Sequence, residues 1–364
     1  MKIAYIGLRG LPANYSGVEK AVDEISSRLK EKHDITVYCM GKKKPNDPTE
    51  YNGIKLKYVR CIPGKNTEMI SYALFSTLKA CFSNVDLIHL HAIGPASMSL
   101  FAILFGKKVV VTNHGIDYQR SKWGKLAKTY LKFGEWMSAN FAHAVIGVSK
   151  HIQQHYSDKY KRKIDYVPNG LDKSTEFSCD ALDKFILQSK EYILYVGRVT
   201  SEKNVHLLIQ AFKNINTTKK LVIVGGVSDQ QYQTMLNELC ANNNRIIFTG
   251  PVYDRSIVNT LYKNAYLFVL PSEIEGLSIV MLEAMSFGCP ILASNIAENK
   301  ELLLENGYFF NSGSVTDLQN VLTTLLNSQE TLKTVDVSNL DQFNWDKIAE
   351  QTEKIYYSCY HLQD

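Results

Sequence analysis

The stretch Tyr192-Ile-Leu-Tyr-Val-Gly-Arg-Val-Thr-Ser-Glu-Lys-Asn-Val-His-Leu-Leu-Ile-Gln-Ala-Phe212 decides the fold class of this chain. Its first five residues are apolar and predict a strand, and residues 204–212 predict a helix. Between them lies a polar loop that begins with a glycine. A strand, a short loop and a helix make half of a βαβ unit, so the stretch predicts a domain built on a parallel sheet.

The same alternation extends in both directions from this stretch. Downstream, we predict strands at residues 220–224, 246–248, 267–270 and 290–293, and helices at 230–241, 255–263, 277–286 and 315–327. Upstream, we predict strands at 3–6, 35–39, 54–59, 87–90, 108–112 and 144–148, and helices at 18–29, 67–82, 96–105 and 124–141. A chain of 364 residues is too long for one core. We therefore predict two parallel α/β domains, at residues 1–171 and 191–343, joined by a polar linker at 172–190.

The composition is that of an ordinary globular protein, with 45% hydrophobic and 21% charged residues. The net charge of +5 is too small to indicate nucleic-acid binding. The seven cysteines are scattered without a C-x-x-C pair, and we interpret them as reduced residues of a cytoplasmic protein. No signal peptide is predicted, and the apolar runs fall short of the ~20 residues that span a bilayer. Any membrane contact would be peripheral.

The tail, residues 344–357, reads as an amphipathic helix. Its apolar positions Trp345, Ile348, Ile355 and Tyr356 recur at helical spacing. From this pattern alone, we interpret the segment as a helix that closes the second domain.

The first candidate site is the loop Gly7-Leu-Arg-Gly-Leu-Pro-Ala-Asn-Tyr-Ser-Gly-Val-Glu19, between the first strand and the first helix. Such a loop points helix N-terminal N–H groups at an anion, and Gly10 and Gly17 would let the backbone approach a phosphate closely. A simple turn is the alternative. An NAD site is disfavoured, because the G-x-G-x-x-G spacing is missing and no acidic residue ends the second strand.

Histidines mark two other strand ends of the first half. His114 follows the strand at 108–112, at the carboxyl edge of the sheet where α/β folds bind ligands, which favours a functional role. His89 and His91 share one face of a strand and could ligate a metal. Without a third ligand, we favour a packing role for both.

The second half offers two charged motifs. Arg198 and Lys203 lie five residues apart across a strand-to-helix turn and could converge on one diphosphate, although two solvated surface cations are the alternative. In Pro271-Ser-Glu-Ile-Glu-Gly-Leu-Ser-Ile-Val-Met-Leu-Glu-Ala-Met-Ser-Phe-Gly-Cys-Pro290, Glu275 and Glu283 are eight residues apart. That spacing is about two helical turns, so we expect both carboxylates on one side of a helix, accepting hydrogen bonds from ligand hydroxyls. The N–H groups of Gly276, Leu277 and Ser278 would meet a phosphate.

These motifs together resemble the family-4 retaining glycosyltransferases. The resemblance covers nearly the whole chain: the glycine loop, Thr-x-His-Gly, Val-Pro-Asn-Gly-Leu-Asp at 167–172, Gly-Arg-x4-Lys, and the E-x7-E segment with its Gly-x-Pro continuation. It implies a GT-B fold, in which two Rossmann-like domains hold a nucleotide-sugar donor in the cleft between them. It also implies that the C-terminal helix, residues 344–364, returns toward the first domain.

The resemblance further implies a role for each candidate residue of the second domain. Arg198 and Lys203 would clamp the donor diphosphate, Glu275 would bind the donor sugar, and Glu283 would hold the ribose hydroxyls. The amides of 276–278 would touch phosphate or sugar.

In the first domain, Gly17 would meet the phosphate and His114 would lie against the transferring sugar. The nucleobase would rest near Val252. His114, Glu275, Arg198 and Lys203 would carry catalysis.

The mechanism that the resemblance implies uses no cofactor other than the donor substrate. Cations and helix N-termini would stabilise the leaving diphosphate without a metal, and the sequence holds no Asp-x-Asp. Retention would proceed by front-face substitution, in which the leaving phosphate takes the acceptor's proton.

The opening loop and residues 115–124 look like bacterial surface-polysaccharide glycosyltransferases, including a rhamnosyltransferase subset. Such enzymes act on a glycan or lipid-linked acceptor. In this chain Ser16 replaces the first glycine of the more usual Gly-Gly pair. Only Gly17 of this pair would then let the backbone approach a phosphate closely. A nucleotide-sugar 2-epimerase and a non-catalytic sugar-nucleotide sensor are the alternative functions on the same fold.

A basic segment suggests peripheral contact with an anionic membrane. Its cations, interleaved with Trp123, Leu126, Tyr130, Leu131 and Phe133, are Arg120, Lys122, Lys125, Lys128 and Lys132. We therefore expect the enzyme at the inner face of the plasma membrane. A solvated helix face is the alternative.

Overall fold

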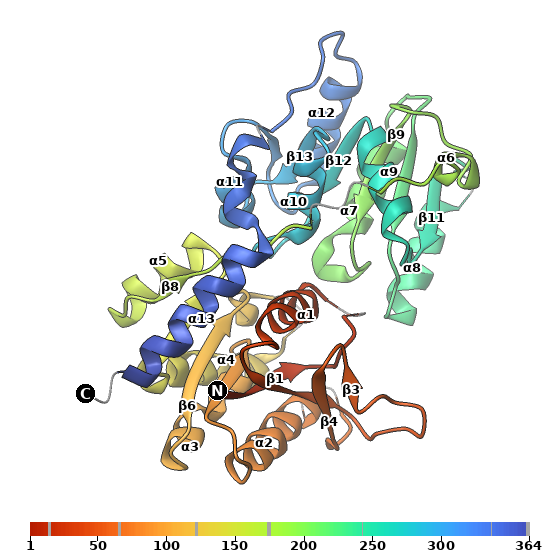
Figure 1. Ribbon diagram of the computed structural model, residues 1–364. Coiled ribbons are helices and arrows are strands. Elements are labelled where there is room, and N and C mark those ends of the chain that lie inside the picture. Colours follow the sequence, from red (N-terminus) through yellow and green to blue (C-terminus); the bar gives the residue numbers. More distant parts are fainter. Residues whose placement is uncertain are drawn as a thin grey trace. The chain divides into compact units, whose positions relative to one another are not determined.

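The computed structural model describes residues 1–13, 16–64, 67–120, 123–172, 176–241, 243–335 and 337–361. The chain forms two compact units (Figure 1). Unit 1 comprises Met1–Gly170 and Gln342–Asp364, and unit 2 comprises Leu171–Asp341. Each unit has its own sheet.

Unit 1 contains an eight-stranded sheet in the order β3-β4-β2-β1-β5-β6-β7-β8. Its strands are β1 (Lys2–Leu8), β2 (Asp34–Met40), β3 (Glu50–Tyr51), β4 (Ile54–Val59), β5 (Leu87–His91), β6 (Lys108–Asn113), β7 (Ala144–Gly147) and β8 (Asp165–Tyr166). All neighbouring strands pair in parallel except β3 and β4. The predicted parallel sheet is therefore confirmed.

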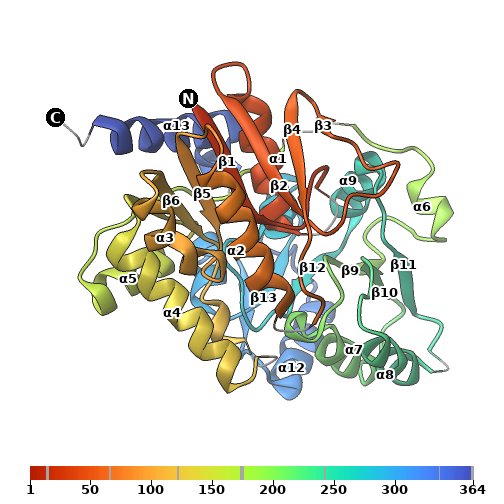
Figure 2. The ribbon, with the colours of Figure 1, turned by 90° about the horizontal axis from the view of Figure 1, so that it is seen from below.

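The helices of unit 1 form two groups. They are α1 (Gly17–Leu29), α2 (Thr67–Cys81), α3 (Ser99–Leu104), α4 (Lys125–Phe141), α5 (Lys150–Tyr160) and α13 (Trp345–His361), with short 3-10 turns at Pro95–Met98 and Asp117–Gln119. Helix α1 packs against α13, whereas α3 contacts both α2 and α4 (Figure 2). The helix predicted at 96–105 is split between the first 3-10 turn and α3.

The C-terminal helix α13 belongs to unit 1. Its first residue, Trp345, packs so closely on Gly170 that a Cβ at Gly170 would lie 2.3 Å from the indole ring. Farther along, Glu353 pairs with His33 at 2.9 Å, and the Tyr356 hydroxyl hydrogen-bonds the Tyr5 hydroxyl at 2.8 Å. The interpretation of this helix as one that closes the second domain is wrong, because the helix belongs to unit 1, and its return to the first domain is confirmed.

Unit 2 contains a six-stranded, fully parallel sheet in the order β11-β10-β9-β12-β13-β14. Its strands are β9 (Tyr192–Val196), β10 (Lys220–Val224), β11 (Ile246–Gly250), β12 (Leu267–Leu270), β13 (Ile291–Ser294) and β14 (Tyr308–Phe310). Its helices are α6 (Ala181–Lys184), α7 (Val205–Lys213), α8 (Gln230–Cys240), α9 (Arg255–Asn264), α10 (Ile279–Ser286), α11 (Ala297–Leu303) and α12 (Val315–Leu326). The second predicted α/β domain is thus present.

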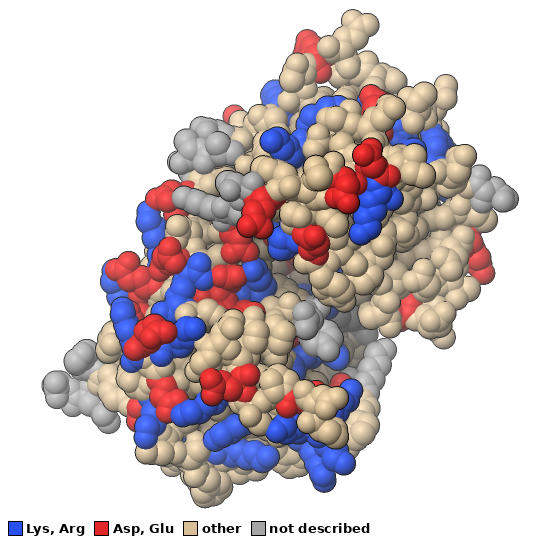
Figure 3. All heavy atoms as spheres, turned by 45° about the vertical axis from the view of Figure 1, so that its right-hand side comes forward, with Lys and Arg blue, Asp and Glu red and all other residues tan. Residues whose placement is uncertain are grey.

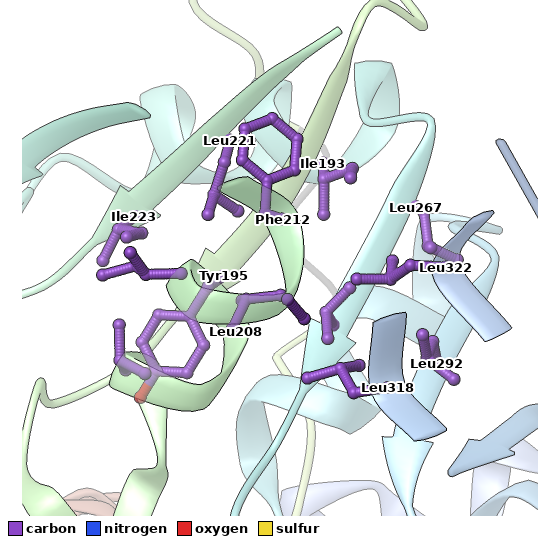
Figure 4. Packing of buried hydrophobic residues seen from close by; sticks show 14 of the residues in the cluster. Ile193, Tyr195, Leu208, Phe212, Leu221, Ile223, Leu267, Leu292, Leu318 and Leu322 are labelled. Atoms are coloured by element: carbon purple, nitrogen blue, oxygen red, sulfur yellow. The ribbon is translucent and has the colours of Figure 1, made fainter. Parts of the chain in front are cut away.

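A hydrophobic core fixes α7 and α12 on the sheet of unit 2. Leu208 and Phe212 of α7, Leu318 of α12, and Ile193 of β9 are almost completely buried and lie in one cluster (Figure 4). Burial of such side chains is worth about 1.5–3 kcal/mol each. The core therefore fixes both ends of the loop between β9 and α7. This loop carries Arg198 and Lys203.

The described residues of the predicted linker, 172 and 176–190, lie in unit 2 and include the short helix α6, which contacts α9. The backbone N–H of Ser178 donates to Thr260 Oγ1 at 3.0 Å. These contacts tie the segment to α9.

The surface shows no dominance of one charge on the face drawn in Figure 3, where basic and acidic side chains are interspersed. This agrees with the small net charge of +5. Within the described part of the chain, no helix is both long and apolar enough to cross a bilayer.

Candidate functional site

The candidate residues of unit 2 lie where the strand order reverses. From β9 the chain proceeds through β10 and β11 on one side and then returns to β12, β13 and β14 on the other. The loops after β9 and β12 leave the same edge of the sheet in opposite directions, which is where open α/β sheets bind ligands. Arg198 and Lys203 follow β9, and Glu275 follows β12.

Lys203 and Glu275 form a largely buried ion pair at this edge. Lys203 Nζ lies 2.6 Å from Glu275 Oε1, although the residues are 72 positions apart in the sequence. An ammonium group has three hydrogen-bond donors, so one lysine can bind a carboxylate and a phosphate together. The pair is therefore suited to a ligand that carries both a phosphate and hydroxyl groups.

Arg198 is exposed near this pair. Its backbone carbonyl accepts a hydrogen bond from the buried Tyr195 hydroxyl at 2.9 Å, which fixes the start of the loop. Within the described ranges, its guanidinium has no hydrogen-bond or ion-pair partner. A fixed backbone with an unpaired guanidinium suits capture of an anion.

Glu283 is held by two residues that the sequence did not single out. Arg255 Nη2 donates to Glu283 Oε1 at 2.7 Å, and the Tyr262 hydroxyl donates to Oε2 at 3.1 Å. Burial and the neighbouring Glu283 charge raise the pKa of Tyr262 far above its usual value, so it remains a donor. Each carboxylate oxygen has two lone pairs, so Glu283 can still accept from ligand hydroxyls.

The expectation that Glu275 and Glu283 share one helix face is wrong. Helix α10 begins at Ile279, with Ser278 as its N-cap, and not near residue 276. Glu275 and Gly276 therefore lie in the preceding loop, where helical periodicity does not apply. Each carboxylate has its own cation instead, Lys203 for Glu275 and Arg255 for Glu283.

The remaining predicted contacts of unit 2 lie in loops. Gly276, Leu277 and Ser278 immediately precede the N-terminus of α10. Val252 is half-buried between β11 and α9, three residues before Arg255.

Glu298 is a further acidic residue near Glu275, and sequence reasoning missed it. It lies in the first turn of α11 and is almost fully buried. Burial, and then the charges of Glu275 and Glu301, raise its pKa to about 7. The carboxyl group is consequently protonated in a large share of molecules near neutral pH.

Unit 1 has its own reversal point, between β1 and β5. Gly7 at the end of β1 has a φ of 119°, and a Cβ there would lie 2.2 Å from the His91 carbonyl oxygen. Only glycine allows this approach. Gly17 is the first residue of α1, and Ser16 is its N-cap. Residues 14 and 15 of the predicted loop lie outside the described residues.

His114 follows β6 and is partly exposed. Its Nε2 lies 3.0 Å from Nδ1 of His91, the last residue of β5. Protein atoms surround the ring closely enough that burial lowers the pKa of His114 to about 4. At neutral pH it is an uncharged imidazole.

His89 has a structural role. Its Nδ1 hydrogen-bonds the Tyr356 hydroxyl and its Nε2 hydrogen-bonds Thr112 Oγ1, both at 2.7 Å. Both ring nitrogens are therefore used within the protein, which anchors α13 to the sheet. In the described parts of the chain, no group of three or more His, Cys, Asp and Glu side chains could hold a metal.

A buried carboxylate, Glu135 of α4, fixes the loop after His114. It accepts hydrogen bonds from His155 at 2.8 Å, Tyr160 at 2.7 Å and Tyr118 at 3.3 Å, and pairs with Lys159. Burial would raise the pKa of Glu135, but these donors lower it. Tyr118 belongs to the 3-10 turn that follows His114, so the cluster ties that turn to α4 and α5.

Two family models match the chain, one in each half. The model described as "Glycosyltransferase Family 4" matches residues 15–175, and "Glycosyl transferases group 1" matches residues 182–336. The chain belongs to the family 4 glycosyltransferases. It is thus a glycosyltransferase, and the predicted family is confirmed.

Similar proteins span most of the chain. The alpha-maltose-1-phosphate synthase of Mycolicibacterium smegmatis is 22% identical, over 98% of this chain and 99% of its own length. The N-acetyl-alpha-D-glucosaminyl L-malate synthase of Bacillus anthracis is 26% identical, over 75% of each chain.

Solved structures share the fold. A sucrose-phosphate synthase from Thermosynechococcus elongatus has a TM-score of 0.81 at 22% identity and covers 100% of both chains. Anabaena Alr3699/HepE in complex with UDP-glucose has a TM-score of 0.79 at 20% identity, over 98% of this chain and 100% of the other. The predicted GT-B fold is confirmed by these likenesses.

Proposed function

We propose that this family 4 glycosyltransferase transfers a sugar, with retention and without a metal, from a nucleotide-diphosphate sugar to a glycan or lipid-linked acceptor of bacterial polysaccharide biosynthesis. The observation that carries the proposal is the Lys203–Glu275 pair at the strand-order reversal of unit 2, with Lys203 on the loop that also carries Arg198, whose guanidinium has no partner among the described residues. Rhamnose is the sugar that the motif resemblance favours. UDP-glucose in the Anabaena neighbour supports a nucleotide-sugar donor.

In this function the donor lies along the carboxyl edge of the unit 2 sheet. Arg198 and Lys203 bind the diphosphate, helped by the partial positive charge at the N-terminus of α10. Glu283, held by Arg255, accepts the ribose hydroxyls, and Glu275 binds the sugar.

The chemistry needs charge stabilisation rather than a metal. As the anomeric bond breaks, negative charge grows on the leaving diphosphate, where fixed cations are most effective. The acceptor attacks from the same face and its proton passes to the leaving phosphate, so the configuration is retained. Gly17 and His114 contribute from unit 1, the glycine to the phosphate and the histidine to the sugar.

A panel of UDP-, GDP-, ADP- and dTDP-sugars in thermal unfolding tests the proposed donor class. A bound ligand at ~100 times its dissociation constant stabilises the protein by about 2.7 kcal/mol. We expect one nucleotide class to raise the melting temperature of the wild type and not of an Arg198→Gln/Lys203→Gln variant. No shift with any nucleotide sugar would contradict the proposal.

The alternatives are separated by product analysis. A transferase releases nucleotide diphosphate when an acceptor is added. A 2-epimerase changes the donor sugar without an acceptor, and a sensor binds the donor without turnover.

Transfer is expected to persist in excess chelator, because Arg198, Lys203 and backbone amides meet the charge of the leaving diphosphate. The measurement is the initial rate before and after addition of EDTA, with a change of less than about twofold expected. Loss of activity that magnesium or manganese restores would refute metal independence.

Helix α4 presents an apolar and basic face that fits an anionic membrane surface. Leu126, Phe133 and Trp136 are 85%, 47% and 44% exposed, and Lys125 and Lys132 are exposed beside them. These positions recur at helical spacing, so they share one side of α4. Phe82, Leu104 and Phe105, at the ends of α2 and α3, are further exposed apolar side chains.

Three other residues of the predicted basic segment, Arg120, Tyr130 and Leu131, do not contribute to this face. Arg120 pairs with Asp117 at 2.8 Å, and Leu131 is buried. The Tyr130 hydroxyl donates to the Gly94 carbonyl at 2.9 Å. Lys122 lies outside the described residues.

Charge reversal of Lys125, Lys128 and Lys132 to glutamate is expected to reduce the affinity for phosphatidylserine vesicles, measured by sedimentation at physiological salt, by at least about 100-fold. Each lysine near such a surface contributes roughly 1 kcal/mol. The matched control reverses three exposed lysines of unit 2: Lys213, Lys300 and Lys333. Equal sedimentation of both triple variants would assign α4 to a solvated face.

A further inference from the structure

We propose that His91 is a positioning residue that fixes the tautomer of His114, so that His114 presents an Nδ1–H donor to the transferring sugar. The proposal rests on the proposed function, because that function places His114 against the sugar. It adds a role for His91, the last residue of β5, and it assigns His114 to the neutral tautomer that carries its proton on Nδ1.

The geometry holds the His91 ring in one orientation. His91 ends β5, and its register partner in β6 is Thr112, two residues before His114. The Tyr5 ring stacks on His91 at 5.5 Å between centroids, and the His89 ring lies at 4.2 Å. His91 therefore cannot turn away from His114, whose ring lies nearly parallel to it at an angle of 25°.

Both imidazoles are neutral at physiological pH. Burial, together with the neighbouring His89 and His114, lowers the pKa of His91 well below its usual value, and burial lowers that of His114. Two neutral imidazoles joined by one hydrogen bond share a single proton in that bond. Either His91 Nδ1–H donates to His114 Nε2, or the reverse holds.

The surroundings of His91 Nε2 distinguish these two forms. This atom is buried and has no hydrogen-bond partner among the described residues. If His91 accepted from His114, its own proton would sit on Nε2 as an unpaired buried N–H. If His91 donates, Nε2 is a bare acceptor instead. Buried orphan N–H groups are the rarer of the two in native proteins, so His91 donates through Nδ1.

The tautomer of His114 follows from this choice. With Nε2 accepting from His91, the single proton of neutral His114 is on Nδ1. No residue in the described ranges hydrogen-bonds this Nδ1. His114 thus offers an N–H to a sugar hydroxyl or to a phosphate oxygen. It has no basic nitrogen available to take the acceptor's proton, which agrees with proton transfer to the leaving phosphate.

Nitrogen NMR tests the tautomer without any substrate. In protein labelled with ¹⁵N-histidine at pH 7, His114 is expected to show a protonated Nδ1 and an unprotonated Nε2, and its signals are assigned by their loss in His114→Asn. A protonated Nε2 on His114 would overturn the proposal. In His91→Leu, which removes the donor to His114 Nε2, we expect the Nδ1–H tautomer of His114 to decrease and the Nε2–H tautomer to increase.

Kinetics test the consequence with a matched pair of variants. The side-chain nitrogen of asparagine lies close to the position of histidine Nδ1, so His91→Asn keeps a donor for His114, whereas His91→Leu does not. Removal of a preorganised hydrogen-bond donor costs roughly 10²–10³ in rate. When His91 no longer fixes the Nδ1–H tautomer of His114, that donor is only less populated, so we expect a smaller loss of about tenfold in kcat. We expect that loss in His91→Leu, near-normal kcat in His91→Asn, and an unchanged dissociation constant in both for the nucleotide diphosphate of the class that the thermal-unfolding panel identifies.

The outcomes separate this inference from the proposed function. Equal losses of kcat in both variants would assign His91 a packing role and refute the proposal. A confirmed Nδ1–H tautomer with full transfer activity in His91→Leu and His114→Ala would refute the catalytic consequence. Absence of nucleotide-sugar binding in the wild type would remove the proposed function and leave the NMR result intact.

Discussion

Replacement of Glu135 by alanine is expected to lower the free energy of unfolding by about 3–5 kcal/mol, because it removes a fully buried carboxylate whose hydrogen bonds are worth about 1.5–3 kcal/mol each. Glu135 is completely buried, and its two oxygens accept from His155, Tyr160 and Tyr118 and pair with Lys159. The substitution removes the acceptor that these donors share and opens a cavity beside α4. Chemical denaturation followed by far-UV circular dichroism measures the change.

The control for Glu135 is Asp158→Ala, an exposed acidic residue of α5, which should change stability by less than about 0.5 kcal/mol. The effect depends on pH. Folding lowers the pKa of Glu135, so its stabilisation is present above the unfolded pKa of ~4.3 and is lost as pH falls below it. Wild type and variant should therefore converge in acid. A Glu135→Ala variant as stable as Asp158→Ala would show that the cluster does not hold the turn after His114.

The sheets were the part of the fold most open to prediction. The central strands β6, β9 and β12 contain short apolar runs, and such runs are typical of buried parallel strands. Because ligand sites in these sheets lie at strand ends, predicted strands also located Arg198, His114 and the Glu275 loop. Helix α5 was missed because only Ile152 and Tyr156 of its eleven residues are buried, which leaves too little apolar periodicity.

Contacts between distant segments could not be read from local patterns. The amphipathic pattern of α13 showed that one face must be buried, but either sheet could have received it. Hydrogen bonds from Tyr356 to Tyr5 and His89 decide for unit 1. The partner of Glu283 raises the same difficulty, because Arg255 is 28 residues away and lies in another helix. An arginine at the start of α9 is the one local signal that could have indicated it.

The two glutamates of unit 2 are expected to differ in what their removal does. Glu283 holds ribose hydroxyls equally in the ground and transition states, so Glu283→Ala should mainly weaken binding of donor and free nucleotide diphosphate. Loss of a hydrogen bond to a charged group costs about 1.5–3 kcal/mol, or roughly 10- to 150-fold in affinity. Because Tyr262 and Arg255 also lose a partner, the melting temperature must be measured alongside.

Glu275→Ala, in contrast, should reduce kcat by about 100-fold and leave the affinity for nucleotide diphosphate within a few-fold, because a misplaced reacting group costs about this much in rate. Glu275 is paired with Lys203 at 2.6 Å, so Glu275→Gln is the control that keeps size and one acceptor while it removes the charge. Calorimetry with free nucleotide diphosphate gives the binding constant, and saturating donor gives kcat. If both alanine variants lose nucleotide affinity alike and keep normal kcat, Glu275 does not bind the sugar.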